Sequence, residues 1–367
     1  MSEPLRVLAV ATYPLLAAAT RYRLLQYVPL LAEEGVHVDV RTFLSDRAFA
    51  GLYDRRRILQ TMGGVVAGIG RRINDAFHLG NYDLIFVQRE AALIGPAVFE
   101  WLAQRSLPMV LDLDDSTYIE RPSEVFGVLA KLLKFHGKTA RMIPWSDHVV
   151  CGNPTIAAYV AKRGVPASIL PTIVDVNAFA PRDESRENDP LVIGWMGTHS
   201  TYAYLRTLIP VFRRLAKTHR FKLRIIGSGR EEAIAGVDTE FAPWQLDREV
   251  AALQAFDIGV YPIIADEWAE GKSGFKSIQY LSCGLPFVAS PVGVVSQIGV
   301  PDETHLEART DDEWEHALSR LLTDAALRRR LRDAGRRYAV EHYSTRESAA
   351  QLAAIFREVV KNKKAAR

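Results

Sequence analysis

Short apolar runs alternate with amphipathic segments along most of this sequence. In the first half, the apolar runs lie at residues 5–11, 36–40, 83–87, 109–111 and 148–150. Segments in which apolar residues recur with the period of an α-helix lie between them, as at residues 22–34 and 97–104. This alternation is typical of βα units, in which helices join buried parallel strands.

A second series of strand-like runs begins at residue 191. These runs lie at 191–196, 222–226, 257–261 and 285–289. The preceding residues are polar and carry Pro181 and Pro190, which is typical of a linker. The pattern therefore predicts an α/β protein with domains at 1–175 and 191–345, a linker at 176–190, and a C-terminal helix with a basic tail at 346–367. In doubly wound sheets of this kind, ligands bind at the carboxyl ends of the strands.

Composition narrows the class of protein. The 367 residues are 48% hydrophobic and 24% charged, with a formal net charge of +3. These values exclude a disordered chain and do not suggest a general nucleic-acid-binding role. No apolar run approaches the about 20 residues that a membrane-spanning helix needs. The longest candidate, at residues 62–70, is short and carries four glycines.

The N-terminal residues and the two cysteines indicate in which cellular compartment the protein is expected. Residues 5–19 could pass for the apolar part of a signal peptide, but Glu3 precedes them and Arg6 interrupts them, so a first buried strand is the better interpretation. Cys151 and Cys283 lie far apart in apolar or turn contexts. We predict that they are buried thiols in a reducing, cytoplasmic compartment.

Three glycine-rich turns lie among the strand-like runs of the second half. The first is Gly197-Thr198-His199, the second is Gly227-Ser228-Gly229, and in the third Lys272 and Lys276 flank Gly274. Such turns let backbone amides approach an anion at the start of a helix, and lysine adds a point charge. Three of them at one sheet edge would suit a diphosphate. The first turn alone is equally well a tight turn with Thr201 as a helix N-cap.

The order of these motifs resembles the donor domain of the family 4 retaining glycosyltransferases, which have the GT-B fold. The most specific segment is 274–290, Gly-Phe-Lys-Ser-Ile-Gln-Tyr-Leu-Ser-Cys-Gly-Leu-Pro-Phe-Val-Ala-Ser. The resemblance covers nearly the whole chain. It implies two Rossmann-like, doubly wound domains that face a cleft, with C-terminal helices that cross back to the first domain. It also implies donor contacts at Gly197, Thr198, His199, Gly227, Gly229, Gly274, Phe275 and Gln279.

The sequence departs from the family at its Glu-x7-Glu motif. Alignment on the Gly-Leu-Pro segment puts Gln279 at the second glutamate and Gly271 at the first. Gln279 can still hydrogen-bond a ribose hydroxyl, whereas Gly271 has no carboxylate and only its neighbour Glu270 could supply one. The arginine and lysine that follow the first glycine turn in the family are also absent. We therefore expect Lys272 and Lys276 to neutralise the diphosphate as catalytic residues, unless both are merely solvated at the start of a helix.

Three aspartates lie at the end of a strand-like run in the first half. The carboxylates of Asp112, Asp114 and Asp115 repel one another unless something uses or neutralises them. We assign Asp114 and Asp115 to catalysis at the acceptor hydroxyl and Asp112 to acceptor binding. A metal site is a second interpretation. We predict no metal, because GT-B enzymes generally do not depend on one and no histidine or cysteine joins the cluster. Helix N-capping by Asp115 or Ser116 is a third interpretation.

Three arginines are expected near the same sheet edge. Arg21 and Arg23 stand where the family has its first glycine-rich loop, although the loop has no glycine here. Arg89 follows the third strand-like run. Arginine can hold an anionic acceptor, or the donor phosphate, through bidentate contacts, so we predict that all three bind the acceptor. Arg89 could equally form an ion pair with Glu90.

The resemblance implies an enzyme that moves a sugar from a nucleotide diphosphate sugar to the hydroxyl of a saccharide or lipid-linked saccharide, with retention and without a cofactor. Lys272, Lys276 and backbone amides near Gly197 and Gly274 would stabilise the charge that develops on the diphosphate. Two alternatives are a GT-B epimerase that acts on nucleotide sugars and an inactive partner subunit.

One segment suggests contact with an anionic membrane. Residues 128–138 mix apolar side chains with Lys131, Lys134 and Lys138, and Arg141 follows. This mixture is typical of an interfacial helix, which would give weak peripheral docking at the inner face of the membrane. The alternative is an ordinary amphipathic helix packed on the first domain.

Overall fold

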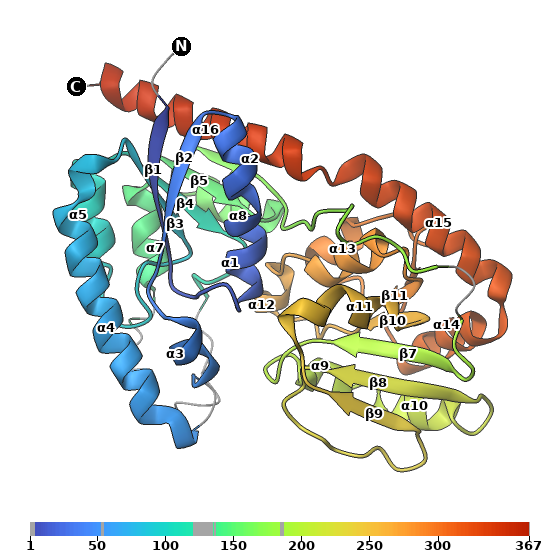
Figure 1. Ribbon diagram of the computed structural model, residues 1–367. Helices are drawn as coiled ribbons and strands as arrows, with labels where there is room; N and C mark the ends of the chain where they lie inside the picture. The colour runs from blue at the N-terminus through green and yellow to red at the C-terminus, as the bar shows by residue number, and fades with distance from the viewer. Residues whose placement is uncertain (1–3, 53–54, 120–134, 136, 184–186, 367) are drawn as a thin grey trace. The chain divides into compact units, whose positions relative to one another are not determined.

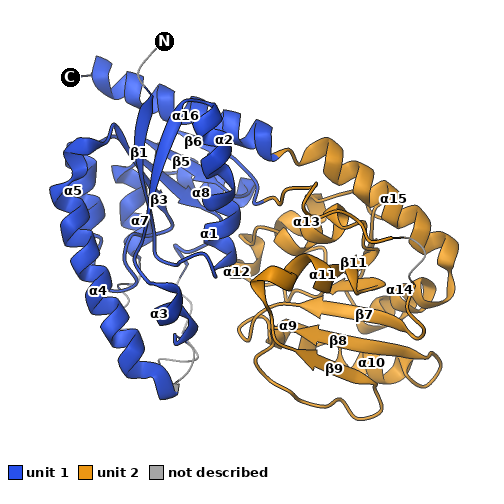
Figure 2. Ribbon diagram, in the orientation of Figure 1, with its two compact units in different colours: residues 1–172, 345–367 blue, residues 173–344 orange. Residues whose placement is uncertain are grey.

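The computed structural model describes residues 4–52, 55–119, 135, 137–183 and 187–366. The chain divides into two compact units, and each has its own parallel sheet (Figure 2). Unit 1 comprises residues 1–172 and 345–367, and unit 2 comprises residues 173–344. None of the helices in the described part of the chain is long and apolar enough to cross a membrane.

Unit 1 contains a six-stranded sheet in the order β2-β1-β3-β4-β5-β6. Its strands are β1 (Leu5–Ala11), β2 (Val36–Thr42), β3 (Leu84–Gln88), β4 (Met109–Leu113), β5 (His148–Cys151) and β6 (Ala167–Ile169). Its helices are α1 (Ala18–Arg23), α2 (Val28–Glu33), α3 (Asp46–Ala50), α4 (Ile58–Phe77), α5 (Val98–Ser106), α7 (Lys138–Met142), α8 (Pro154–Ala161) and α16 (Thr345–Ala365).

Both faces of this sheet are covered, as the apolar strand runs predict. In β1, Val7 and Ala9 pack on one face with residues of α2 and α16, while Leu8 and Val10 pack on the other with residues of α5 and α8 (Figure 1). The C-terminal helix α16 buries its apolar stripe here, and its Phe356 ring meets Phe86 of β3 at a centroid distance of 5.3 Å.

Unit 2 contains a second six-stranded sheet, in the order β12-β11-β10-β7-β8-β9. Its strands are β7 (Leu191–Met196), β8 (Phe221–Ile226), β9 (Thr239–Ala242), β10 (Ile258–Tyr261), β11 (Phe287–Ala289) and β12 (Leu306–Glu307). Its helices are α9 (Tyr202–Arg206), α10 (Ile209–Leu215), α11 (Glu249–Gln254), α12 (Glu267–Glu270), α13 (Phe275–Ser282), α14 (Asp311–Thr323) and α15 (Ala325–His342).

The sequence patterns locate most of these elements, but they do not predict helix α4. Two further differences concern short strands and the first predicted helix. The three strands β6, β9 and β12 are not predicted. The predicted helix at residues 22–34 is instead two helices, α1 and α2, separated by a 3₁₀ turn at Leu25–Tyr27. Cys151 and Cys283 are buried free thiols, as expected, and burial raises the pKa of each to about 12. The predicted two-domain α/β architecture is confirmed.

Candidate functional site

The first two glycine turns of unit 2 lie against each other. Gly197 follows β7 and Gly227 follows β8, and these strands are parallel neighbours in the sheet. Gly227 has a φ of 78°, and a Cβ atom added to it would overlap the carbonyl oxygen of Gly197. Gly229 has a φ of 66°, and a Cβ atom added to it would make an ordinary contact of 3.5 Å with the Cβ of His199. Glycine is therefore required where the two turns meet.

The amides of these turns make bonds within unit 2. Gly197 N donates to Ile226 O at 2.9 Å, and Gly227 N donates to Ala242 O at 3.0 Å. The amide of Thr198 donates to the Oγ1 atom of Thr201 at 3.0 Å. These three amides are therefore engaged within the unit, and the expectation that backbone amides near Gly197 and Gly274 bind the diphosphate stays a prediction. Thr201 precedes α9 but makes no side-chain cap to that helix, because its hydroxyl closes the turn onto Thr198.

The two predicted lysines lie at the same sheet edge as the first turn. The Nζ atom of Lys276 is 5.3 Å from the ring centroid of Tyr261, which ends β10, and 5.8 Å from that of Trp195 in β7. The Nζ atom of Lys272 is 5.2 Å from the ring centroid of Tyr204 in α9. Cation–π contacts of this kind hold an ammonium group over the face of an aromatic ring.

Backbone geometry fixes where α13 begins. Gly274 precedes the helix with a φ of 64°, and a Cβ atom there would overlap the side chain of Ile298. The chain can therefore turn into α13 only with glycine at this position. Lys276 follows in the first turn of the helix, close to Phe275, and Gln279 lies one turn later.

Gln279 is buried and points to a carboxylate that the sequence analysis missed. Its Nε2 atom donates to the Oε1 atom of Glu249 at 3.3 Å, and Glu249 is itself buried at the start of α11. Thirty positions separate the two residues, and no local motif marks Glu249. One signal in the sequence could have identified Glu249. The family motif has Gln279 in place of its second glutamate, so another carboxylate of the same domain, at the start of a helix, could have been sought to replace it.

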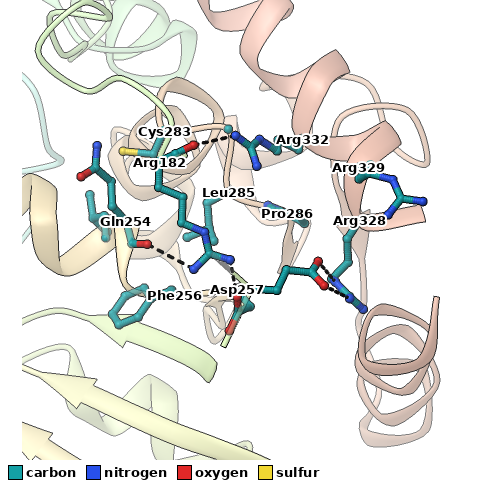
Figure 3. Close-up of a pocket in the computed structure, with 13 residues that line it drawn as sticks. Arg182, Gln254, Phe256, Asp257, Cys283, Leu285, Pro286, Arg328, Arg329 and Arg332 are labelled. Carbon is teal, nitrogen blue, oxygen red and sulfur yellow. Dashed lines mark hydrogen bonds and ion pairs between the residues drawn. The ribbon is translucent and has the colours of Figure 1, made fainter. Parts of the chain in front are cut away.

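Unit 2 also contains a cavity of about 370 Å³ at the opposite edge of its sheet, where Asp257 precedes β10 and Pro286 precedes β11 (Figure 3). Arg182 pairs with Asp257, and Arg328 donates to both carboxylate oxygens of Glu187, at 3.0 and 2.8 Å. Arg332 donates to the carbonyl of Arg182 at 2.7 Å. These contacts attach Arg182 and Glu187 to the body of unit 2. The lining of the cavity does not include Lys272 or Lys276, so the cavity is separate from the lysine edge.

In unit 1, Arg89 neutralises two of the three aspartates. It follows β3 directly, with a φ of 61°, and its Nη2 atom donates to Asp114 at 2.7 Å and to Asp115 at 2.6 Å. Burial tends to raise the pKa of Asp114, but the charge and hydrogen bonds of Arg89 outweigh it and hold that pKa below its usual value. Asp114 is buried, whereas the side chain of Asp115 is 26% exposed.

Arg23 neutralises the third aspartate. Its guanidinium makes a bidentate ion pair with Asp112, and it also donates to the carbonyl of Leu170. Both side chains are buried. Arg21 is buried too, and it donates to the carbonyls of Leu15 and Leu16, which shapes the loop before α1. Arg23 and Asp112 are enclosed and bound to each other, and Arg21 is enclosed at the loop before α1. The assignment of these three residues to the acceptor stays a prediction.

Two other interpretations of this edge are answered by the partner of Glu90 and by the backbone of residues 115–119. Glu90 pairs with Lys138, at 2.8 Å, so the alternative pair of Arg89 with Glu90 is wrong. Asp115 and Ser116 cap no helix within residues 115–119. Among the residues that the structure describes, no group of three histidine, cysteine, aspartate or glutamate side chains is placed to hold a metal ion.

The predicted interfacial segment lies largely outside the described residues. Lys131 and Lys134 belong to the stretch for which the structure gives no placement. Lys138 is described, and it is buried, bound to Glu90 and to the carbonyl of Ala92. Lys138 is therefore wrong as a candidate for contact with a lipid headgroup.

Comparison with known proteins adds to this geometry. Residues 190–324, which include both glycine turns, both lysines and α13, match the family model of glycosyl transferases group 1. A curated relative, the MMP α-(1→4)-mannosyltransferase of Mycolicibacterium hassiacum, is 32% identical over 118 residues, which make up 31% of this chain. The aligned part spans 28% of that relative, so the chain matches less than a third of its length.

Solved structures match nearly the whole chain. A glycosyltransferase from Rickettsia africae aligns with a TM-score of 0.71 and 12% identity over 98% of this chain and 100% of its own. Sucrose-phosphate synthase from Thermosynechococcus elongatus aligns with a TM-score of 0.68 and 14% identity over 98% and 100%. HepE from Anabaena in complex with UDP-glucose aligns with a TM-score of 0.68 and 12% identity over 96% and 100%.

The fold is GT-B. The two six-stranded parallel sheets correspond to the two domains of that fold. The match to the group 1 glycosyl transferases concerns residues 190–324, which lie within unit 2.

Proposed function

We propose that this protein transfers a sugar from a nucleotide diphosphate sugar to the hydroxyl of a saccharide or lipid-linked saccharide, with retention of configuration. The observation that carries the proposal is the gathering of Lys272 and Lys276 beside the first glycine turn, at the carboxyl edge of the unit 2 sheet. Two further findings support it. The segment that holds these residues matches the group 1 glycosyl transferases, and HepE, which shares the fold, binds UDP-glucose.

The proposed chemistry is a front-side displacement. The bond between the anomeric carbon and the diphosphate oxygen breaks, the acceptor oxygen bonds to the same face of that carbon, and the departing phosphate oxygen takes the acceptor proton. The two ammonium groups stabilise the negative charge that grows on the diphosphate. Asp114 is a poor base for that proton, because Arg89 lowers its pKa and both of its oxygens accept hydrogen bonds.

Saturation-transfer NMR with UDP-, GDP- and dTDP-sugars, followed by a product assay with and without acceptors, tests this function. Binding of one nucleotide sugar with slow hydrolysis, and sugar transfer once an acceptor is added, is the expected result. Conversion of the bound sugar without any acceptor would instead indicate an epimerase. Absence of binding to all three donors would indicate an inactive subunit.

Asp115 and Asp114 provide a prediction for the acceptor side. Asp115→Asn and Asp114→Asn should each raise the acceptor KM or lower kcat several-fold while the Kd of the donor stays unchanged, because both residues belong to unit 1. Activity should survive EDTA. Steady-state kinetics at varied acceptor, with donor titration by calorimetry, measures both effects. Loss of all activity in EDTA that magnesium or manganese restores would contradict the assignment and favour a metal at the aspartates.

Glu249 provides a prediction for the nucleotide. We propose that Glu249 and Gln279 together bind the ribose hydroxyls, with Glu249 supplying the carboxylate that the motif lacks. Glu249→Gln keeps the shape of the side chain and should weaken donor binding about tenfold, since a hydrogen bond to a charged group contributes about 1.5–3 kcal/mol. Binding of the free nucleoside diphosphate, measured by calorimetry, should weaken by the same factor. An unchanged Kd in Glu249→Gln would remove Glu249 from the donor site.

A further inference from the structure

Helix α4 of unit 1 buries mainly polar and small residues and exposes large apolar ones. The side that faces the unit carries Thr61, Gly68, Arg72 and Asp75, all of them buried. A Cβ atom at Gly68 would lie 2.7 Å from the carbonyl oxygen of Phe43, so the helix is drawn close to the unit by a residue without a side chain. In an ordinary surface helix the apolar side faces the core. Here small and polar residues occupy that side.

Most of the large apolar residues of α4 face outward, whereas Val65 packs against the buried cluster of Phe43, Leu44 and Ala48. Leu59, Val66 and Phe77 are 80%, 70% and 83% exposed. At spacings of three and four residues these side chains form one stripe, hereafter the α4 stripe, which comprises Leu59, Met62, Val66, Ile69, Ile73 and Phe77. More exposed large hydrophobic side chains lie on α4 than on any other element of the described chain. A contiguous apolar patch of this kind on a protein surface is usually an interaction site.

The neighbouring helix extends the patch. Helices α4 and α5 pack side by side (Figure 1), and α5 exposes Val98, Trp101 and Leu102. The guanidinium of Arg105 lies 3.5 Å from the ring centroid of Trp101. An aromatic ring with an arginine across it has one apolar and one cationic side, a combination suited to the boundary between hydrocarbon and headgroups.

The exposed charged side chains on α4 and α5 are all positive. Their only carboxylates are buried: Asp75 pairs with Arg72 at 2.7 Å, and Glu100 accepts a hydrogen bond from the amide of Ala91. The exposed residues Arg56 and Arg57 precede α4, and the exposed Arg105 lies on α5 beside Trp101. An apolar stripe bordered by arginines, without an exposed carboxylate on either helix, complements an anionic surface that has an apolar interior.

We propose that the α4 stripe docks this protein on an anionic lipid bilayer. The helix would lie in the plane of the interface, with Leu59, Val66 and Phe77 in the acyl boundary and the arginines against lipid phosphates. A second copy of the chain fits the surface less well, because pairing two such faces would bring their bordering arginines together, and the carboxylates of α4 and α5 are buried. This docking goes beyond the proposed sugar transfer and does not require it.

Vesicle binding by the full chain tests the proposal. Co-sedimentation should be strong with vesicles that mix phosphatidylglycerol with phosphatidylcholine at low salt, weaker at high salt, and slight with pure phosphatidylcholine. The double variant Val66→Glu, Phe77→Glu should bind anionic vesicles at least tenfold more weakly. The polar variant Leu59→Gln, Phe77→Gln should also bind more weakly, which separates loss of apolar contact from repulsion by added acids. Both should keep the wild-type circular dichroism spectrum.

Val340→Glu is the matched control, because Val340 is 52% exposed on α15 of unit 2, and it should bind as the wild type does. The proposal is overturned if the wild type ignores both kinds of vesicle, if it binds them equally, or if the stripe variants bind as the wild type does. A dimer in solution that Val66→Glu dissociates, without any vesicle binding by the wild type, would also overturn it and would assign the stripe to a second copy.

Discussion

Lys276→Ala should lower kcat about 10²-fold, the effect expected when one group that stabilises transition-state charge is removed. Lys272→Ala should have an effect of the same order. In the proposed reaction, charge grows on the leaving diphosphate, and the two ammonium groups lie beside the first glycine turn, held over Trp195, Tyr261 and Tyr204. The loss should fall mainly on kcat, because the substrate carries less charge on the bridging oxygen than the transition state does.

Steady-state kinetics with the donor identified by NMR checks this prediction, and Lys217→Ala is the matched control because Lys217 is an exposed lysine of the same unit. The melting temperature should stay close to wild type in all three variants, since cation–π contacts of half-exposed lysines contribute little to stability. Near-wild-type kcat in both active-site variants would show that Lys272 and Lys276 are only solvated residues at a helix start.

The central strands could be predicted from sequence, and the short edge strands could not. A strand buried on both faces needs a continuous apolar run, which is why the patterns at 5–11 and 191–196 coincide with β1 and β7. Strand β6 is three residues long and largely exposed, and β12 has two residues. Such short segments have too few alternating positions to stand out from a loop.

Helix α4 escaped prediction for a different reason. Its four glycines in residues 62–70 weaken the helical signal, since glycine is among the least favourable residues in a helix interior. Tertiary contacts override that cost, because Gly64 and Gly68 let the helix approach Ala48 and Phe43 closely. A periodic apolar stripe also says nothing about which side of a helix meets the core, and on α4 the apolar side faces outward.

At the candidate sites, the order of strands and turns in the sequence predicted which residues lie at each sheet edge. It did not predict which side chains bind one another there. Turns at the ends of parallel strands must meet at one edge, so Gly197, Gly227 and the lysines could be brought together without coordinates. Partner choice depends on side-chain reach between distant segments. Arg23 and Asp112 are eighty-nine positions apart, and Gln279 and Glu249 are thirty apart. Only the folded chain shows that Arg23 forms an ion pair with Asp112 and that Arg89 forms one with Asp114.

Arg23→Met should lower the free energy of unfolding by about 3–5 kcal/mol, because it leaves the carboxylate of Asp112 buried without its partner. Asp112→Leu should cost a similar amount by leaving the guanidinium of Arg23 buried. The double variant Arg23→Met, Asp112→Leu should recover much of that loss, since two apolar side chains of similar volume leave no uncompensated charge. Urea unfolding of the four proteins gives the coupling energy directly.

Arg41→Met is the control for this cycle. Arg41 pairs with Asp39 at 2.7 Å in β2 of the same unit, but both side chains are about half exposed. Water screens that pair, so its loss should cost less than about 1 kcal/mol. Equal effects of Arg23→Met and Arg41→Met, or a double variant as unstable as the sum of the two single variants, would show that burial does not set the strength of the Arg23–Asp112 pair.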